Sequence, residues 1–386
     1  MKRGWWLAGL ALALGCAEAT PLEPVADLAA AKGGGTATGA QTLTVMTHNL
    51  YVGADVDAVI AAIVGGDQAE ILASLVTAYG ELLRTDFPSR AEAIADEILK
   101  ARPHVVGLQE LTRLTLDFTA LYPTYLPIEI QYQMEFLPYL MDALDDRELD
   151  YDLITVKNID VDVAPVPGTV ARLEDWDGML IRGDLTPTAT GGANFTACLG
   201  PSPCLGGPLP IKRGYVWATI PINGVPVTFV SSHPESGNAP DIAGVRLMQI
   251  VELMQWLGPA APVVLMGDLN EDPGADLIPG YPSVYEVLMG AQFNDVWREL
   301  RPGAVGFTCC HASDLSDRIP AGFDERIDYI LTRGIGRSGP GLQGSMAIVG
   351  LVPSSRIAGP LGMIWPSDHA GLVANLLFPP AWAGTK

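Results

Sequence analysis

Short apolar runs recur along almost the whole chain and constrain its fold more than any other feature. They are rich in β-branched and aliphatic residues and are bounded by turn residues, which is typical of strands. They lie at 43–47, 105–108, 151–156, 178–181, 215–220, 225–231, 263–266, 327–331 and 371–376. Helical patterns lie between them, at 68–84, 90–101, 132–149 and 242–257. The alternation predicts a layered α/β fold, and the 42 glycine and 31 proline residues exclude an all-helical bundle.

The two runs at 215–220 and 225–231 are joined by Asn223-Gly224, the strongest short signal for a β-hairpin. At least part of the sheet is therefore antiparallel, which argues against a pure Rossmann or TIM-barrel design. No glycine-rich dinucleotide fingerprint, P-loop or internal repeat occurs in the 386 residues. The strand patterns continue to the end without a polar linker, so we expect one domain over residues 42–380.

The chain is acidic, with 23 lysine and arginine residues against 44 acidic ones and a net charge of −21. Proteins that hold long nucleic acids usually present a basic face, so nucleic-acid binding is possible but not favoured by net charge. A local basic groove stays open as an alternative, and its candidate residues are Arg172, Arg182, Lys212, Arg213 and Arg326.

The amino terminus has the pattern of a secretory signal. Lys2 and Arg3 precede an apolar run that is too short to span a membrane, so we expect residues 1–19 to be a signal peptide. Two processing sites compete, small residues around Ala19 and a bacterial lipobox that ends at Cys16, and we favour lipid attachment at Cys16. Residues 20–41 lack periodicity and predict a flexible tether. We therefore expect an exported protein, either a cell-surface or periplasmic lipoprotein or a secreted one, whose only membrane contact is that anchor.

Four further cysteines remain: Cys198, Cys204, Cys309 and Cys310. An even number in an oxidising compartment predicts disulfides, but the sequence leaves their connectivity open. A zinc site built from Cys309, Cys310 and His311 has no second half at ligand spacing and is not favoured.

Polar residues of the types that take part in catalysis and metal binding lie at the ends of the predicted strands. A single strand-end Asp or Asn usually caps a turn, but six strands that each deliver such a group predict a shared functional rim. These residues are Asn49, Glu110, His233, Asp268, Asn270, Asp328, Asp368 and His369.

The residue types fit the metal-assisted hydrolysis of a phosphate ester. Glu110, Asp368 and the amide of Asn49 are hard oxygen ligands that suit Mg²⁺, with Mn²⁺ as a substitute. His369, with Asp328 as its partner, holds a proton near neutral pH. Asp268 orients or deprotonates a water. Asn270 and His233 donate hydrogen bonds to oxygens where negative charge builds.

Six strings occur in the order found in the endonuclease/exonuclease/phosphatase superfamily, which includes DNase I-like and exonuclease III-like nucleases and neutral sphingomyelinases. They are TVMTHNL, VVGLQEL, VSSHPES, VVLMGDLNEDP, ERIDYIL and WPSDHAG, and they are spread from residue 43 to 376, nearly all of the mature chain. The chain resembles a secreted bacterial member. The resemblance implies a four-layered α/β sandwich, in which two mixed, mostly antiparallel sheets are flanked by helices.

The resemblance also implies roles position by position. Asn49, Glu110 and Asp368 match the family's metal-site residues, and Asp268 and Asn270 match its catalytic Asp-x-Asn. The remaining matches are to a phosphate-contacting His, an Asp that orients the terminal His, and the catalytic His itself, namely His233, Asp328 and His369.

Other positions stay open. Arg246 and Gln249 resemble family residues, although a salt-bridged helix face explains them equally well, and we interpret His48 as a packing residue. Asp177 is read as a turn residue in preference to a polar contact at the site. The segment 51–102 is longer than in the nucleases, which leaves the substrate in doubt but not the reaction class.

We therefore expect an exported, monomeric, Mg²⁺-dependent phosphoesterase that hydrolyses a small or lipid-derived phosphodiester by metal-assisted attack of water. The first alternative is an extracellular DNA or RNA endonuclease of the same fold. A non-catalytic binding protein is less favoured, because no member of the residue set is missing.

Overall fold

The computed structural model describes residues 41–199, 211–318, 322–335 and 342–378. The predicted signal peptide, which includes Cys16, lies outside the described residues, and so does Cys204. So does the predicted tether except for Gln41, the first residue of strand β1 (Gln41–Asn49).

Two large mixed sheets form the centre of the described part of the chain. Sheet A has the strand order β12-β15-β1-β2-β5-β4, with β3 paired to β2, and sheet B has the order β10-β11-β9-β8-β7-β6. Between described strands the pairing is antiparallel except for β1 with β2 and β8 with β9. The further strands of sheet A are β2 (Val105–Asp117), β3 (Gln131–Glu135), β4 (Tyr151–Val163), β5 (Val170–Arg182), β12 (Gly344–Val349) and β15 (Gly371–Phe378). Those of sheet B are β6 (Ala189–Asn194), β7 (Gly214–Ile222), β8 (Val225–His233), β9 (Val263–Asp268), β10 (Asn294–Asp295) and β11 (Asp328–Arg333). A small hairpin consists of β13 (Ile357–Gly359) and β14 (Gly362–Ile364).

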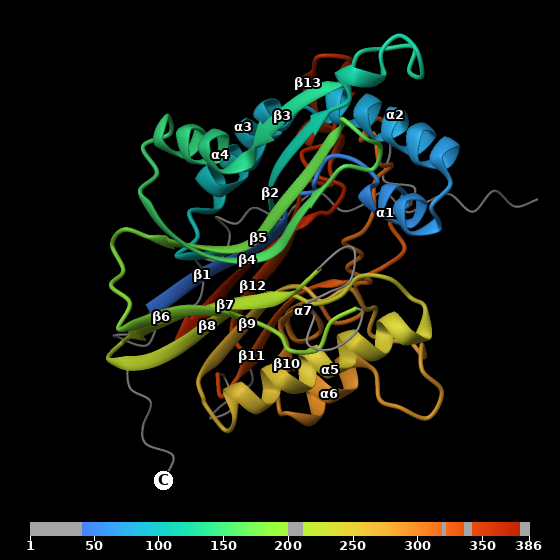
Figure 1. Ribbon diagram of the computed structural model, residues 1–386. Helices are drawn as coiled ribbons and strands as arrows, with labels where there is room; N and C mark the ends of the chain where they lie inside the picture. Colours follow the sequence, from blue (N-terminus) through green and yellow to red (C-terminus); the bar gives the residue numbers. More distant parts are fainter. Residues whose placement is uncertain (1–40, 200–210, 319–321, 336–341, 379–386) are drawn as a thin grey trace, which may run out of the picture.

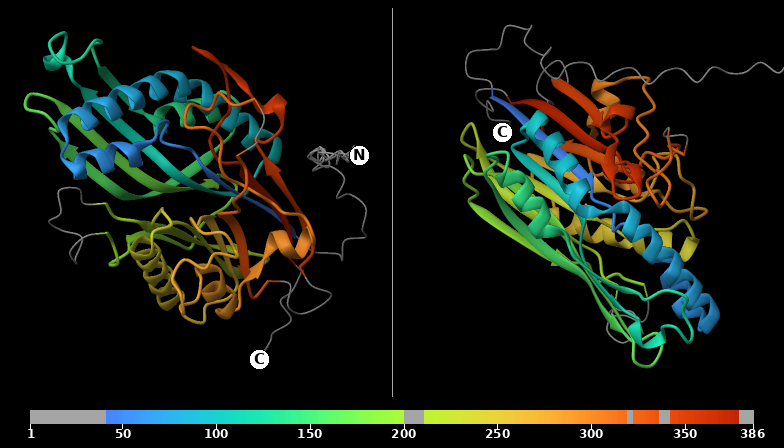
Figure 2. Two further views of the ribbon diagram at one scale, coloured as in Figure 1. Left: turned by 90° about the vertical axis from the view of Figure 1, so that its right-hand side faces the viewer. Right: turned by 90° about the horizontal axis from the view of Figure 1, so that it is seen from above.

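Helices cover the outer faces of both sheets. In Figure 1 the layers run from α3 and α4, over sheet A, down through sheet B to α5 and α6. Seen from above, α3 and α4 lie side by side, and Phe87 of α3 stacks on Phe136 of α4 (Figure 2). The helices are α1 (Val56–Gly65), α2 (Gln68–Thr85), α3 (Phe87–Ala101), α4 (Phe136–Asp145), α5 (Pro240–Leu257), α6 (Val284–Gly290) and α7 (Val296–Leu300), with single turns at η2 (Thr119–Leu121) and η3 (Pro353–Ser355). None of the helices in the described ranges is both long and apolar enough to cross a bilayer.

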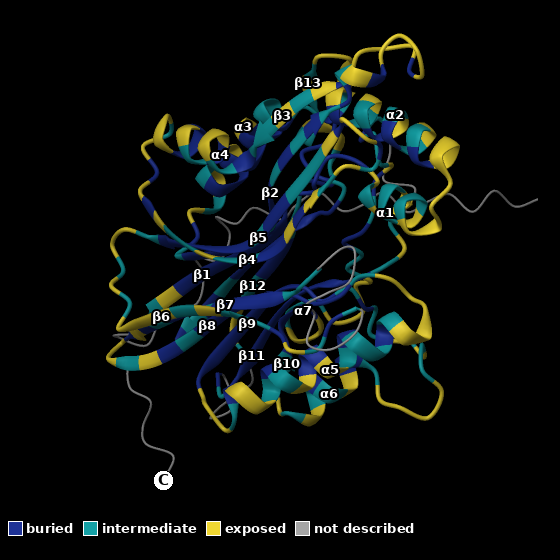
Figure 3. Ribbon diagram, in the orientation of Figure 1, coloured by how far each residue is buried: buried dark blue, intermediate teal, exposed yellow. Residues whose placement is uncertain are grey.

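The main core lies between the facing surfaces of the sheets, which are the most buried part of the molecule (Figure 3). Met179 of β5, Val216 of β7, Phe229 of β8 and Met266 of β9 are fully buried there. Gly107 of β2 marks a close approach, because a Cβ at this position would lie 2.7 Å from the Ser231 hydroxyl oxygen. The predicted four-layered α/β sandwich is thus confirmed.

The predicted strands and three of the four predicted helices are present, and the β7–β8 hairpin turns at Asn223 and Gly224, both with positive φ. The helix predicted at 132–149 is wrong at its start, because β3 occupies Gln131–Glu135 and α4 begins at Phe136. His48 is fully buried, as a packing residue should be, and its Nε2 lies 3.3 Å from Glu97 Oε2.

The long segment after β1 folds into α1, α2 and α3. Strands β2, β4 and β5 extend beyond the part of sheet A that packs against sheet B. Helices α1 and α2 cover this extension (Figure 1). The covered face belongs to a separate apolar cluster that includes Leu75 and Leu82 of α2 and Leu114 and Leu116 of β2. The insertion therefore borders the same end of the sheets as the candidate site.

Candidate active site

The predicted strand-end residues meet at one rim. Asn49 is the last residue of β1, and His233 and Asp268 are the last residues of β8 and β9. Asp328 begins β11 and pairs directly with Asp268 across the antiparallel ladder. Sheet A therefore supplies one side of the site and sheet B the other.

Asn49 joins the two sides. Its amide Nδ2 donates hydrogen bonds to Glu110 Oε1 at 3.0 Å and to Asp268 Oδ2 at 3.1 Å. The other oxygen of Glu110 accepts the Val52 backbone N–H at 2.7 Å. The amide thus holds a carboxylate of sheet A and a carboxylate of sheet B around one point.

Left-handed backbone conformations cluster at this point. Tyr51 and Glu110 have φ of 59° and Asn270 has φ of 56°. Such angles are uncommon for non-glycine residues, and they persist where the surrounding structure imposes them, often at functional sites. Glu110 lies where the β2–β5 register shifts, between Leu108 and Leu111, so the irregularity turns its carboxylate out of the normal strand alternation.

His369 and Asp328 form the predicted pair. His369 Nδ1 lies 2.8 Å from Asp328 Oδ2, and its Nε2 lies 3.8 Å from Asp268 Oδ2. Burial acts to lower the pKa of His369, but the carboxylates of Asp328, Asp368 and Asp268 outweigh it and raise the pKa well above 6.5. The imidazole is therefore held as a cation with its Nε2 toward Asp268.

Two carboxylates of the site are buried and hold their protons more tightly than usual. Burial, reinforced by Asp328, raises the pKa of Asp268 to about 7, and burial raises that of Asp368 to about 6 with a further contribution from Glu110. Negative charge in excess of the nearby cations is what a divalent cation would neutralise. Asp268, Asp328 and His369 also offer ligand atoms within 4.8 Å of one another. The carboxylates of Glu110 and Asp368 offer the hard oxygen ligands that a divalent metal such as Mg²⁺ takes.

His233 lies on the sheet B side and is almost fully buried. Its Nε2 is 3.6 Å from Asp268 Oδ2, and its Nδ1 is 3.4 Å from an Arg213 nitrogen. Burial and the charge of Arg213 lower its pKa well below 6.5, so the ring is neutral. Asn270 lies beside it, where its amide donates to the Pro234 carbonyl at 3.1 Å and its backbone N–H donates to Asp268 Oδ1 at 2.9 Å.

Asp177 is not the turn residue that the sequence favoured. It lies inside β5, is fully buried, and has Oδ1 3.8 Å from His233 Nδ1. The reason is that β5 starts eight residues before the apolar run by which it was recognised, so the turn falls earlier in the chain. Arg246 does form a salt bridge, with Glu271 at 3.3 Å, but neither it nor Gln249 lies on an exposed helix face. Both are fully buried, with Arg246 donating to the carbonyls of Glu235 and Gly237.

Asp175 was not found from the sequence, and Arg213 was named there only as a candidate for a basic groove. Asp175 is buried at the lining of the cleft, and burial, with a further contribution from Glu110, raises its pKa to about 8. Arg213 pairs with Glu235 at 3.2 Å and, of the five candidate basic residues, is the only one that lines the cleft. Arg172, Arg182 and Arg326 instead pair with carboxylates elsewhere, so a basic groove built from these residues is absent from the described structure.

Arg90 of α3 is another residue that sequence reasoning missed. It is fully buried and donates hydrogen bonds to the carbonyls of Thr85, Leu50, Tyr51 and Pro366. The arginine thus ties the loop after Asn49 to the loop before Asp368. No motif marks such a role, because its partners are backbone carbonyls far apart in the chain.

The cysteines lie beside the site. The sulfur atoms of Cys309 and Cys310 are in contact, and both residues line the cleft with His369. His311 also lines the cleft, its ring stacks on Trp365 and its Nδ1 lies 2.8 Å from Asp317 Oδ2. The two sulfur atoms and a ring nitrogen of His369 lie within 4.8 Å of one another.

The site opens into one cleft of about 690 Å³. Its lining includes Glu110, His233, Asp268, Asn270, Asp368 and His369, together with Asp55 and Asp57 from the insertion. Six of the eight predicted site residues therefore face the cleft, while Asn49 and Asp328 bind neighbouring site residues from behind.

Comparison with known proteins agrees with this geometry. Residues 46–369 match the model of the Endonuclease/Exonuclease/phosphatase family. No curated protein sequence matches the chain. A family protein from Beutenbergia cavernae is similar in structure, with a TM-score of 0.53, 17% identity, and 88% of this chain and 72% of that chain covered.

A family protein from Leptotrichia buccalis gives a TM-score of 0.51 at 15% identity, covering 87% of this chain and 100% of that chain. A third, from Bacteroides thetaiotaomicron, gives a TM-score of 0.50 at 17% identity, covering 88% of this chain and 98% of that chain. At these identities the structures support the fold alone. With the family model spanning both the first and the last motif of the site, the chain belongs to the Endonuclease/Exonuclease/phosphatase family of phosphoester hydrolases.

Proposed function

We propose that this protein is an exported, Mg²⁺-dependent phosphodiesterase that acts on a small or lipid-derived phosphodiester. One observation carries the proposal: three side chains converge on Asp268 Oδ2. The amide of Asn49 lies 3.1 Å from this oxygen, the imidazole of His233 3.6 Å and the imidazole of His369 3.8 Å. Hydrolysis of a phosphate ester needs a positioned water together with donors around the phosphoryl oxygens.

Asp268 is the group that orients the attacking water and accepts its proton. Its raised pKa, about 7, makes it a useful base near neutral pH. His369, kept cationic by Asp328, donates a hydrogen bond to a phosphoryl oxygen and stabilises the charge that develops there. Neutral His233 and the amide of Asn270 provide further donors on the sheet B side.

Glu110, Asn49 and Asp368 are the residues that would hold Mg²⁺, or Mn²⁺ in its place. The metal would supply a Lewis acid for a phosphoryl oxygen. The Asn49 amide contributes in its own right, because it fixes the distance between Glu110 and Asp268 before any ligand binds.

The character of the cleft supports a substrate with little negative charge beyond one phosphodiester. Arg213 is the only lysine or arginine among its described lining residues, whereas Asp55, Asp57 and Glu325 stand among its acidic ones. A nucleic-acid strand would bring further phosphates against these carboxylates, which is why the nuclease remains the alternative.

Export, with lipid attachment at Cys16 or release by cleavage near Ala19, remains part of the proposal, as does a disulfide between Cys309 and Cys310. Both rest on the signal pattern of residues 1–19 and on the contact of the two sulfur atoms.

The proposal is tested with residues 42–386 and the variant H369A, incubated with Mg²⁺ or with a chelator. The substrates are plasmid DNA, RNA, sphingomyelin and bis(p-nitrophenyl) phosphate. We expect hydrolysis of the lipid or the small diester by the wild type, loss with chelator, and a loss of about 10³-fold or more in H369A.

Each other result has a defined meaning. Cleavage of DNA or RNA alone would make the protein a nuclease of the same family. Equal activity of the wild type and H369A on every substrate would contradict the assignment of the site.

A further inference from the structure

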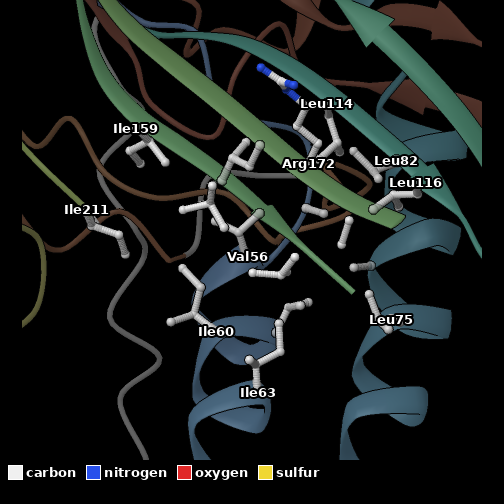
Figure 4. A pocket seen from close by; sticks show the side chains of 17 residues that line it. Val56, Ile60, Ile63, Leu75, Leu82, Leu114, Leu116, Ile159, Arg172 and Ile211 are labelled. Atoms are coloured by element: carbon white, nitrogen blue, oxygen red, sulfur yellow. The ribbon is translucent and has the colours of Figure 1, made fainter. Parts of the chain in front are cut away.

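A second, apolar pocket opens next to the acidic cleft. It has a volume of about 80 Å³ and lies between α1, α2 and the extended ends of β2, β4 and β5. Figure 4 shows Val56 and Ile63 of α1 in the space between this helix, Leu75 of α2 and the strands, with Ile60 on the side of α1 nearer Ile211. The one charged lining residue is Arg172, whose guanidinium points away from these side chains and pairs with Glu174 at 3.2 Å.

The pocket and the cleft are continuous. Six residues line both of them: Ala54, Val56, Ile60, Ile159, Leu173 and Ile211. On β5, Ala171 and Leu173 line the pocket and Asp175 lines the cleft, and because side chains two apart share one face of a strand, all three lie on the same face. At a rise of ~3.3 Å per residue, the pocket begins roughly 7 Å along the strand from Asp175.

Helix α1 is too apolar to serve only as a cover. All of its residues except Asp57 and Gly65 are apolar, yet none is buried. A helix of this composition normally buries one face against its neighbours. Val59 and Ile63 are partly buried against the apolar cluster below it, and Val56, Ile60 and Ile63 also line a space that a ligand can enter.

We infer that this pocket binds an alkyl or acyl chain carried by the substrate, and so selects phosphodiesters with an apolar substituent. The inference deepens the proposed function and rests on it. Apolar walls with few polar groups, adjoining a site with precisely placed polar ones, are typical of small-molecule sites. The acidic rim of the cleft leaves this pocket as the place for the uncharged part of such a molecule.

The size of the pocket sets a limit on what it holds. Its volume is about half of the ~150 Å³ cavity that admits benzene, so it has room for roughly three carbon atoms. Burial of each methylene raises kcat/KM up to about fourfold. We therefore expect the rate to rise over the first few carbons of an alkyl chain and then to level off.

The test uses p-nitrophenyl n-alkyl phosphates from methyl to octyl with Mg²⁺. Ala171→Trp fills the pocket and should reduce the chain-length dependence to less than about twofold. Ile63→Ala enlarges the pocket and should move the plateau to longer chains. The matched control is Ala58→Trp, the same exchange at an exposed position of α1 that lines neither space, and it should behave as the wild type.

A wild-type rate that is independent of chain length would overturn the inference and leave the phosphodiesterase standing. If no ester is hydrolysed, the proposed function fails, and calorimetry with methylphosphonate and n-hexylphosphonate decides the pocket separately. Tighter binding of the hexyl compound that is lost in Ala171→Trp would support the pocket, and no preference between the two compounds would overturn it.

Discussion

At the scale of single residues, Asp268 is where the parts of the site meet. It accepts from Asn49 at 3.1 Å and lies within 4 Å of both His233 and His369. Asp268→Asn keeps the volume but removes the base and the charge that faces His369. We expect kcat to fall about 10³-fold or more with Tm little changed, measured by steady-state kinetics and thermal unfolding. Asp276→Asn makes the same exchange at an exposed carboxylate and should retain wild-type activity, and equal losses in both variants would count against the role of Asp268.

Glu174 allows a prediction about pH and stability. Hydrogen bonds and ion pairs from Lys157 and Arg172, set against a smaller cost of burial, lower its pKa from 4.5 to about 2. Because the folded state favours the carboxylate, its stabilising contribution is complete above pH 4.5 and is lost as the pH falls toward 2. We expect the wild type to lose stability over that interval.

Glu174→Gln should flatten this part of the curve, as measured by denaturant unfolding at a series of pH values. The matched variant is Glu92→Gln, whose carboxylate pairs with an arginine but is more than half exposed. Acid sensitivity that is identical in Glu174→Gln and the wild type would show that other carboxylates control this interval.

At the scale of elements, Arg90 links α3 to the two loops that carry site residues. Arg90→Met leaves the carbonyls of Leu50, Tyr51, Thr85 and Pro366 without their donor, and hydrogen bonds from a charged group are the stronger ones. We expect a loss of about 3 kcal/mol in the free energy of unfolding and at least a tenfold loss of kcat, as the loops relax.

Arg90→Lys separates these effects, because one ammonium group satisfies only part of the set. It should recover part of the stability and part of the activity. Full activity in Arg90→Met under conditions where it is folded would show that the loops keep their position without this residue.

Some elements were predicted from the sequence and others were missed. Strands that carry the site were predicted because both of their faces are buried near the rim, so they appear as continuous apolar runs, such as Val263–Asp268. The outer parts of β2, β4 and β5 were missed, because polar or charged residues alternate with apolar ones there and no continuous apolar run marks them. Helix α1 was missed because apolar residues surround it without a stripe.

The site shows the same division. Residues at strand ends, such as Asn49 and Asp268, are visible as polar residues after an apolar run. Arg90, Asp175 and Arg213 are not, because their roles arise from pairing between distant segments, as in the contact of Arg213 with Glu235. The sequence thus predicts which residues carry the chemistry, whereas their supports depend on tertiary structure.

At the scale of the whole molecule, the proposed anchor predicts where the protein is found. Full-length protein expressed in a bacterial host should incorporate an alkyne-labelled fatty acid and sediment with membranes. Cys16→Ser should lose the label while it keeps its specific activity, because residues 1–19 precede the first strand of the enzyme domain. Membrane sedimentation of Cys16→Ser equal to that of the wild type would rule out lipid attachment at this residue.

Because the site is divided between two sheets, catalytic activity depends on how the two sheets are positioned relative to each other. Asn49 and Glu110 belong to one, and Asp268 and Asp328 belong to the other. A shift of one sheet relative to the other by about the distance between neighbouring strands, ~4.8 Å, would leave the hydrogen bonds within each sheet intact. It would nevertheless separate these partners. Enzyme activity should therefore disappear earlier than secondary structure when the protein is gradually destabilised, and neither sheet could carry the reaction if it were moved alone into another protein.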